Sequence, residues 1–156
     1  MVRLLALIRI KGTVKVPKRV RETLDRLRLT KRNSMAIYYH TPSIEGMIKR
    51  VDRYLAWGEI DTNLLAALLE KRGRVRNGRK IDYRCLQRFG CQSITELAEG
   101  IEKGNLNDYV KKGLLRVFRL TPPSKGFPAD LRKPFRIGGV WGYQGDRVCD
   151  LIEKMM

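Results

Sequence analysis

The sequence predicts a fold that mixes strands and helices, with a β-α-β-α-β unit in residues 1–60 and a mostly helical extension in residues 61–156. Two observations support this prediction. Apolar residues near the N-terminus alternate at a period of two, which indicates a strand, and the spacing then switches to three and four, which indicates helices. The length of 156 residues fits one domain, or a small domain with a second piece appended.

The first strand and the first helix follow from the apolar spacing. Residues 4–10 carry an unbroken apolar face at period two, and Gly12 ends the strand. From residue 17 to 29 the apolar side chains recur on one helical face, and Pro17 suits a first helical turn. We therefore expect a strand with one face in the core, followed by a helix with basic flanks.

The remainder of the unit repeats this order. Residues 35–39 alternate again, residues 41–42 (Thr-Pro) are typical of a helix start, and a clean apolar stripe covers 44–55. Gly46 inside this helix costs about 1 kcal/mol relative to alanine, which close approach of another backbone would explain. A short third strand over 56–60 completes the unit, and both helices are expected on one face of its sheet.

The extension is predicted to be helical at first and irregular later. A helix capped near residue 61 ends at Gly73, and further helices are expected over 81–89, 93–104 and 148–155. Val117 and Leu120 are expected in a short strand. Residues 121–145 contain four prolines and five glycines without clear periodicity. Loops of this length are uncommon in compact domains and are usually functional or disordered, so we expect an irregular basic loop there.

The charge indicates a polyanionic partner. The chain has 33 Lys and Arg against 16 Asp and Glu, a formal net charge of +17. A compact protein with this excess attracts polyanions, so nucleic acid is the leading candidate and an anionic membrane surface ranks well behind it. No apolar run approaches the length of a bilayer span, no signal-peptide pattern is visible, and the three cysteines suit a reducing compartment. A soluble, cytoplasmic protein is expected.

Two segments concentrate the features of an RNA-binding surface. Residues 71–80 hold six basic side chains and no acid, and Asn77-Gly78 marks a turn, so a basic hairpin tip is expected. In 121–145, basic residues alternate with aromatic ones. Arginine forks bind phosphates bidentately, and aromatic faces can stack on unpaired bases or anchor the loop to the core.

Signals for catalysis are weak. His40 is the one histidine, and the spacing of the cysteines forms no zinc-binding pair. No phosphate-binding loop or nucleophile elbow is present. The fold could bring Asp82, Asp108 and Asp130 together as in a carboxylate nuclease, although nothing in their spacing suggests it. No metal, cofactor or small-molecule substrate is therefore expected.

Several motifs resemble a known family. Pro17-Lys18-Arg19, Thr23-Leu24 and Gly46-Met47-Ile48-x-x-Val51 resemble the large-subunit ribosomal protein L thirty. Trp57-Gly58-Glu59 and residues 119–126 resemble its longer archaeal form, which is related to the eukaryotic protein L seven. The chain departs from the family's Leu-Gly-Leu motif, because Arg28 stands in the place of the glycine.

The resemblance implies an α+β fold with a three-stranded antiparallel sheet, somewhat like a ferredoxin fold. It also implies a non-enzymatic constituent of the cytoplasmic ribosome that contacts large-subunit rRNA and neighbouring ribosomal proteins. The RNA contacts transferred from the family are Lys15, Lys18, Arg19, Lys31, Arg32, Asn33, Lys49 and Arg50. The two basic segments add Arg72, Arg74, Arg76, Arg79, Lys80, Lys125, Phe127, Arg132, Lys133, Arg136 and Trp141.

Two rival functions make different predictions. An RNA-processing enzyme or enzyme subunit would turn RNA over and would depend on a metal ion. A basic DNA-compacting protein would bind duplex DNA as tightly as RNA. A structural ribosomal protein does neither.

Overall fold

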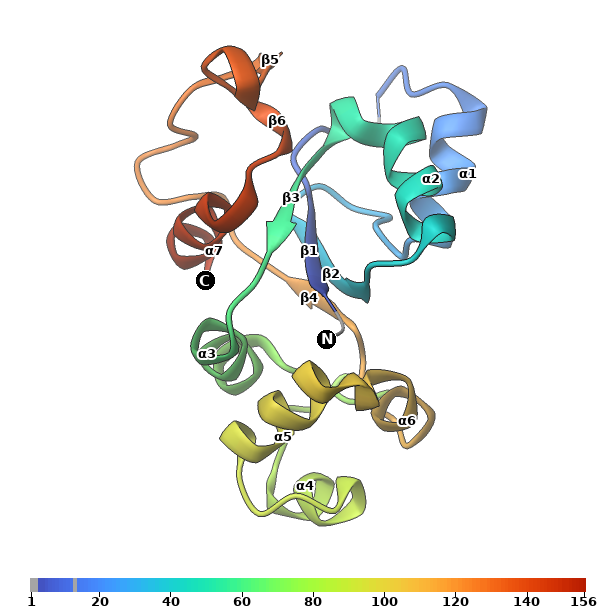
Figure 1. Cartoon of the computed structure of the whole chain (residues 1–156), viewed down its shortest axis with the longest axis vertical. Helices are drawn as coiled ribbons and strands as arrows, with labels where there is room; N and C mark the ends of the chain where they lie inside the picture. The colour runs from blue at the N-terminus through green and yellow to red at the C-terminus, as the bar shows by residue number, and fades with distance from the viewer. Residues whose placement is uncertain (1–2, 13) are drawn as a thin grey trace.

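The computed structural model describes residues 3–12 and 14–156, and its strands form one six-stranded sheet with helices on both faces (Figure 1). The strands are β1 (Leu4–Arg9), β2 (Ser34–Tyr39), β3 (Leu55–Glu59), β4 (Val117–Arg119), β5 (Asp130–Pro134) and β6 (Gly139–Tyr143). The α-helices are α1 (Lys18–Arg26), α2 (Pro42–Val51), α3 (Thr62–Arg72), α4 (Tyr83–Phe89), α5 (Ile94–Gly100), α6 (Leu106–Lys111) and α7 (Val148–Met155). Short 3-10 helices cover Asp52–Tyr54, Phe135–Ile137 and Gly145–Arg147, and Ile101–Asn105 forms a π-helical turn.

The sheet has six strands in the order β4-β2-β1-β3-β6-β5, so the prediction of a three-stranded sheet is wrong. β1 pairs antiparallel with β2 and β3, as expected, but the extension adds β4 antiparallel to β2 and β6 parallel to β3. β5 then pairs parallel with β6, inside the segment expected to be irregular. The added strands satisfy backbone groups that a three-stranded sheet would leave unpaired at both edges. The sheet is mixed, and the ferredoxin-like resemblance is not confirmed.

The helices α1 and α2 cover one face of the sheet, as predicted (Figure 1). On this face Leu5 and Leu7 of β1 pack with Leu24 of α1 and Ile48 of α2 in a buried cluster. Thr41 caps α2, because its hydroxyl oxygen accepts a hydrogen bond from the backbone N–H of Ile44 at 3.2 Å. The sequence pattern predicts only one face of β1 in the core, but this second face is buried as well.

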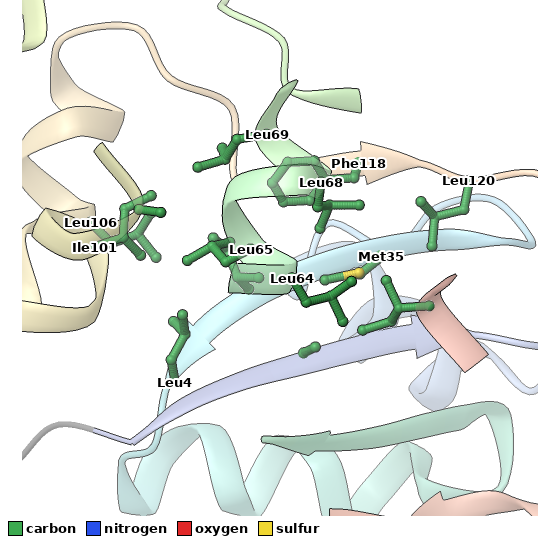
Figure 2. Packing of buried hydrophobic residues seen from close by; sticks show 14 of the residues in the cluster. Leu4, Met35, Leu64, Leu65, Leu68, Leu69, Ile101, Leu106, Phe118 and Leu120 are labelled. Carbon is green, nitrogen blue, oxygen red and sulfur yellow. The ribbon is translucent and has the colours of Figure 1, made fainter. Parts of the chain in front are cut away.

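The opposite face carries the larger apolar cluster and is covered by the extension. Leu4, Ala6 and Ile8 of β1 belong to this cluster together with side chains from α3, α5, α6 and α7. Figure 2 shows Leu64 and Leu68 of α3 directed toward the sheet. Both faces of β1 are thus buried. Residues 61–156 complete the core to which residues 1–60 contribute the first part.

Truncation after Ile60 is expected to abolish cooperative thermal unfolding. The fragment would expose Leu4, Ile8, Met35 and Ile37, each of which is buried in the full chain. Burial of one such side chain contributes about 1.5–3 kcal/mol, and net domain stability is only about 5–15 kcal/mol. Circular dichroism should show a broad, featureless melt for the fragment beside a sharp transition for the full chain. A sharp transition in the fragment would show that residues 1–60 fold independently.

Helix α1 ends earlier than the apolar spacing predicts, because Arg28 adopts a left-handed backbone. Its φ angle is +64°, and the following N–H, of Leu29, donates to the carbonyl of Leu24 at 2.9 Å. The helix thus terminates in the way that a glycine would favour, although the glycine of the family motif is absent. A left-handed conformation costs a non-glycine residue roughly 1 kcal/mol, so the chain retains a strained position here.

Candidate nucleic-acid interface

Three adjoining hollows lined by arginine run from the α1–α2 pair to β4 at the edge of the sheet. We call this region the arginine surface. It comprises Arg19, Arg26, Arg28, Arg50, Arg72, Arg74, Arg76, Arg116 and Arg119. Neighbouring hollows share lining residues, so the positive charge is continuous. Among the described residues, Glu22 is the one carboxylate that lines it.

The first hollow lies between α1 and α2 and encloses about 650 Å³. Arg19 and Arg26 come from α1, and Arg50 comes from the last turn of α2. The apolar stripes of both helices face the sheet, which leaves these charged side chains on the solvent side. Amphipathic packing therefore directs the basic flanks of both helices into a shared groove.

The second hollow joins the end of α1 to β4 and encloses about 450 Å³. Arg26 and Arg28 line it on one side and Arg76 and Arg116 on another. The Arg116 guanidinium lies 4.9 Å from the ring centroid of Tyr38, and it also donates a 3.1 Å hydrogen bond to Asn107 Oδ1. Burial raises the pKa of Tyr38, so this phenol stays neutral beside the arginines. Arg116 is thereby held in place at the surface.

The third hollow follows β4 to the end of α3. Arg72, Arg74 and Arg119 line it around the apolar side chains of Leu115 and Val117. The Arg72 guanidinium donates two hydrogen bonds, at 3.2 and 2.8 Å, to the backbone carbonyl of Met156. Arg72 therefore also ties α3 to the end of α7.

The predicted basic hairpin is present at residues 74–80 and contributes to this surface. Arg74 pairs with Lys80 across the turn, Gly78 has a φ of +76°, and its N–H donates to the carbonyl of Val75 at 2.7 Å. Val75 bridges to Leu114 in the strand-like segment that leads to β4. The hairpin is thus held against the segment that precedes β4, with Arg76, Arg79 and Lys80 exposed. Of these three, Arg76 lines the second hollow.

The turn at residues 31–33, directly before β2, borders the arginine surface near the end of β4. Lys31 and Arg32 are exposed, and the carbonyl of Asn33 accepts a 3.1 Å hydrogen bond from the N–H of Leu120, just after β4. Asn33 has a φ of +64°, which asparagine tolerates better than most residues. The β2–β4 pairing therefore brings this turn close to Arg119.

A buried arginine fixes this turn, and sequence reasoning did not identify it. Arg9 is 2% exposed, and its guanidinium donates to the carbonyls of Leu29 at 2.7 Å, Lys11 at 3.1 Å and Gly12 at 3.3 Å. Its own carbonyl accepts the N–H of Asn33 at 2.8 Å. Burial lowers the pKa of Arg9. The three backbone carbonyls that accept its hydrogen bonds satisfy its buried donor groups. Arg9 thus links the segment after β1 to the segment after α1.

The predicted contact residues fall into two groups in the structure. Five lie on the arginine surface itself: Arg19, Arg50, Arg72, Arg74 and Arg76. Lys15 and Lys18 are exposed near the start of α1, whereas Lys49 is engaged by Glu45 at 3.1 Å. Arg26, Arg28, Arg116 and Arg119 belong to the surface but were not predicted. Their convergence depends on the β2–β4 pairing, which the sequence pattern did not reveal.

The second group lies at the opposite edge of the sheet, on β5 and its neighbours. The exposed basic residues there are Lys125, Arg132, Lys133 and Arg136. Phe127 and Trp141 are half-buried against the larger core cluster, and the Trp141 Nε1–H donates to the carbonyl of Arg132 at 3.2 Å. Stacking of these two rings on RNA bases stays a prediction. Five strand spacings of about 4.8 Å separate β4 from β5, so the two basic edges are roughly 24 Å apart.

The carboxylates singled out for a nuclease site have separate structural positions. Asp82 caps α4, since its Oδ1 accepts the N–H of Cys85 at 2.9 Å, and Asp130 Oδ1 accepts the N–H of Arg132 at 2.9 Å. Asp108 lies in the first turn of α6. Within residues 3–12 and 14–156, no group of three or more His, Cys, Asp or Glu side chains is placed to hold a metal ion.

Comparison with known proteins identifies the family. Residues 5–55 match the family described as Ribosomal protein L30p/L7e. The chain is 40% identical to the large ribosomal subunit protein uL30 of Nanoarchaeum equitans, over 96% of each chain. It is 37% identical to that of Ignicoccus hospitalis, over 99% of this chain and 98% of the relative, and 37% identical to that of Methanobrevibacter smithii, over 96% and 97%. This chain belongs to the L30p/L7e family of large-subunit ribosomal proteins.

Proposed function

We propose that this protein is a non-catalytic structural constituent of the large ribosomal subunit that binds and stabilises folded large-subunit rRNA. The observation that carries the proposal is its similarity to uL30 proteins over nearly the full length of both chains. The arginine surface supports it, because nine guanidinium groups on one continuous surface, from the α1–α2 pair to β4, suit a phosphate backbone. The protein then works in the cytoplasmic ribosome.

The mechanism we propose is charge neutralisation by preorganised arginines at two places. Phosphates in a folded RNA repel one another. The arginine surface neutralises that charge and lets neighbouring phosphates approach, and exposed turns such as 31–33 extend the contact. The basic edge at β5 binds a second RNA segment roughly 24 Å away, by the strand-spacing estimate above. A rigid sheet that joins two RNA contacts fixes their relative position, which is how the protein would stabilise the subunit.

Residues 1–60 supply the RNA-binding core in this proposal. Residues 61–156 supply the extension that completes the sheet, contributes five arginines to the arginine surface and adds the second basic edge. Neighbouring ribosomal proteins are the further partners that the family implies. Among the described residues, no helix has both the length and the apolar character needed to cross a membrane.

Sedimentation tests the proposal directly. The native protein should remain with the large subunit through a high-salt wash and should be absent from the small-subunit fraction. Purified protein should leave RNA intact with or without EDTA, and should prefer protein-free large-subunit rRNA over duplex DNA of equal length. RNA cleavage that EDTA stops would favour the rival enzyme, and equal affinity for DNA would favour the compaction protein.

Binding to rRNA is expected to depend steeply on salt. If the two basic surfaces neutralise about 6–10 phosphates, log affinity should fall with log salt concentration at a slope of roughly −4 to −9. Titrations of protein-free large-subunit rRNA between 50 and 300 mM KCl measure the slope. A slope near −1 would mean that phosphate contacts contribute little, contrary to the proposed mechanism.

A further inference from the structure

We propose that the second hollow, between the end of α1 and β4, seats a backbone phosphate of the rRNA, with Arg28 as a principal contact residue. This inference rests on the proposed function and adds one specific site to it. The hollow is lined by Arg26, Arg28, Tyr38, Arg76 and Arg116, together with apolar side chains. Among the described residues, no carboxylate lines it.

The chemistry of the hollow fits a phosphodiester. Four guanidinium groups come from three separate parts of the chain, namely the end of α1, the 74–80 hairpin and the segment before β4. A planar guanidinium matches two phosphate oxygens at once, and several of them can surround one group. The ring of Tyr38 beneath Arg116 and the 3.1 Å bond to Asn107 Oδ1 restrict the motion of that arginine. The site is therefore partly organised before RNA binds.

The backbone of Arg28 provides the second, independent observation. Its φ of +64° is the conformation that glycine adopts without strain, yet an arginine occupies the position. Its side chain is exposed and forms no ion pair with any described residue, so the folded protein gains little from it. Three other described non-glycine residues have a positive φ, namely Lys15, Asn33 and Lys125. All three are predicted RNA-contact residues. Strain of this kind is typical of functional positions.

The test is a substitution that should raise stability and lower binding together. Arg28→Gly relieves the left-handed strain, so the melting temperature should rise by about 2–4 °C. The same change should weaken binding to protein-free large-subunit rRNA about fivefold near 0.1 M salt and make the salt slope shallower by about one. Arg28→Gln keeps the strain and loses the charge, so it should show the same loss of affinity without the gain in melting temperature.

An exposed arginine outside the arginine surface provides the control. Arg84→Gln, on α4, should change neither the melting temperature nor the affinity beyond the loss of one distant charge. If both Arg28 variants bind with wild-type affinity while the wild-type protein prefers rRNA over duplex DNA, the proposed phosphate-binding site is wrong and the proposed function stands. If the wild-type protein binds rRNA and duplex DNA equally, both the proposed function and the proposed phosphate-binding site are wrong.

Discussion

Replacing Arg26, Arg76, Arg116 and Arg119 together by glutamine is expected to lower the affinity for large-subunit rRNA about a thousandfold near 0.1 M salt. If each lost phosphate contact costs about 1 kcal/mol, four contacts cost about 4 kcal/mol, and every 1.4 kcal/mol is a factor of ten. The salt slope should become shallower by about three. Filter binding or fluorescence titration at several salt concentrations measures both quantities.

A charge-matched variant separates this site from general electrostatic attraction. Arg3, Arg84, Lys103 and Lys154 are exposed and lie outside the arginine surface, so replacing all four by glutamine removes the same formal charge. This control should lose far less affinity, because distant charges are screened within about 10 Å at 0.1 M salt. Equal losses in the two variants would mean that net charge, and not the arrangement at β4, determines binding.

The N-terminal unit was predictable because its signals are local and repeated. Alternation over residues 4–10 and 35–39 places β1 and β2, and the caps and stripes place α1 and α2 within a few residues. The Asn77-Gly78 turn likewise predicts the basic hairpin, which is present. Each of these features requires only neighbouring residues, so the sequence pattern contains the whole signal.

Strands β5 and β6 were missed, and the pairing of the short strand expected near residues 117–120 was not predicted, because these sequences lack such a signal. β4 has only three residues, too few to show a period, and β5 and β6 contain a proline and glycines. These strands form by pairing with edges that the N-terminal unit supplies, which is a tertiary effect. The same reason explains the unpredicted arginines. Arg116 and Arg119 flank or end β4, and only its pairing with β2 brings them near Arg26 and Arg28.

A methyl group added at Gly58 is expected to destabilise the protein by about 3 kcal/mol, which lowers the melting temperature by roughly 6–12 °C. A Cβ atom there would lie 2.2 Å from the carbonyl oxygen of Gly145, far inside any allowed contact. The turn before α7 approaches β3 closely because the N–H of Gln144 donates to the carbonyl of Trp57 at 2.8 Å. In Gly58→Ala the turn must retreat, which weakens the β3–β6 pairing and the packing of α7. Differential scanning calorimetry measures the shift.

Gly46→Ala gives the matched control, with the opposite sign. Gly46 lies inside α2, and no described atom would come within 4 Å of its added Cβ, so close approach within this chain does not explain the glycine. Alanine should therefore stabilise the helix by about 1 kcal/mol and raise the melting temperature slightly. The two substitutions add the same methyl group, so a difference in sign isolates the contact at Gly145. Equal melting temperatures for both variants would show that the turn moves away from β3 without loss of packing.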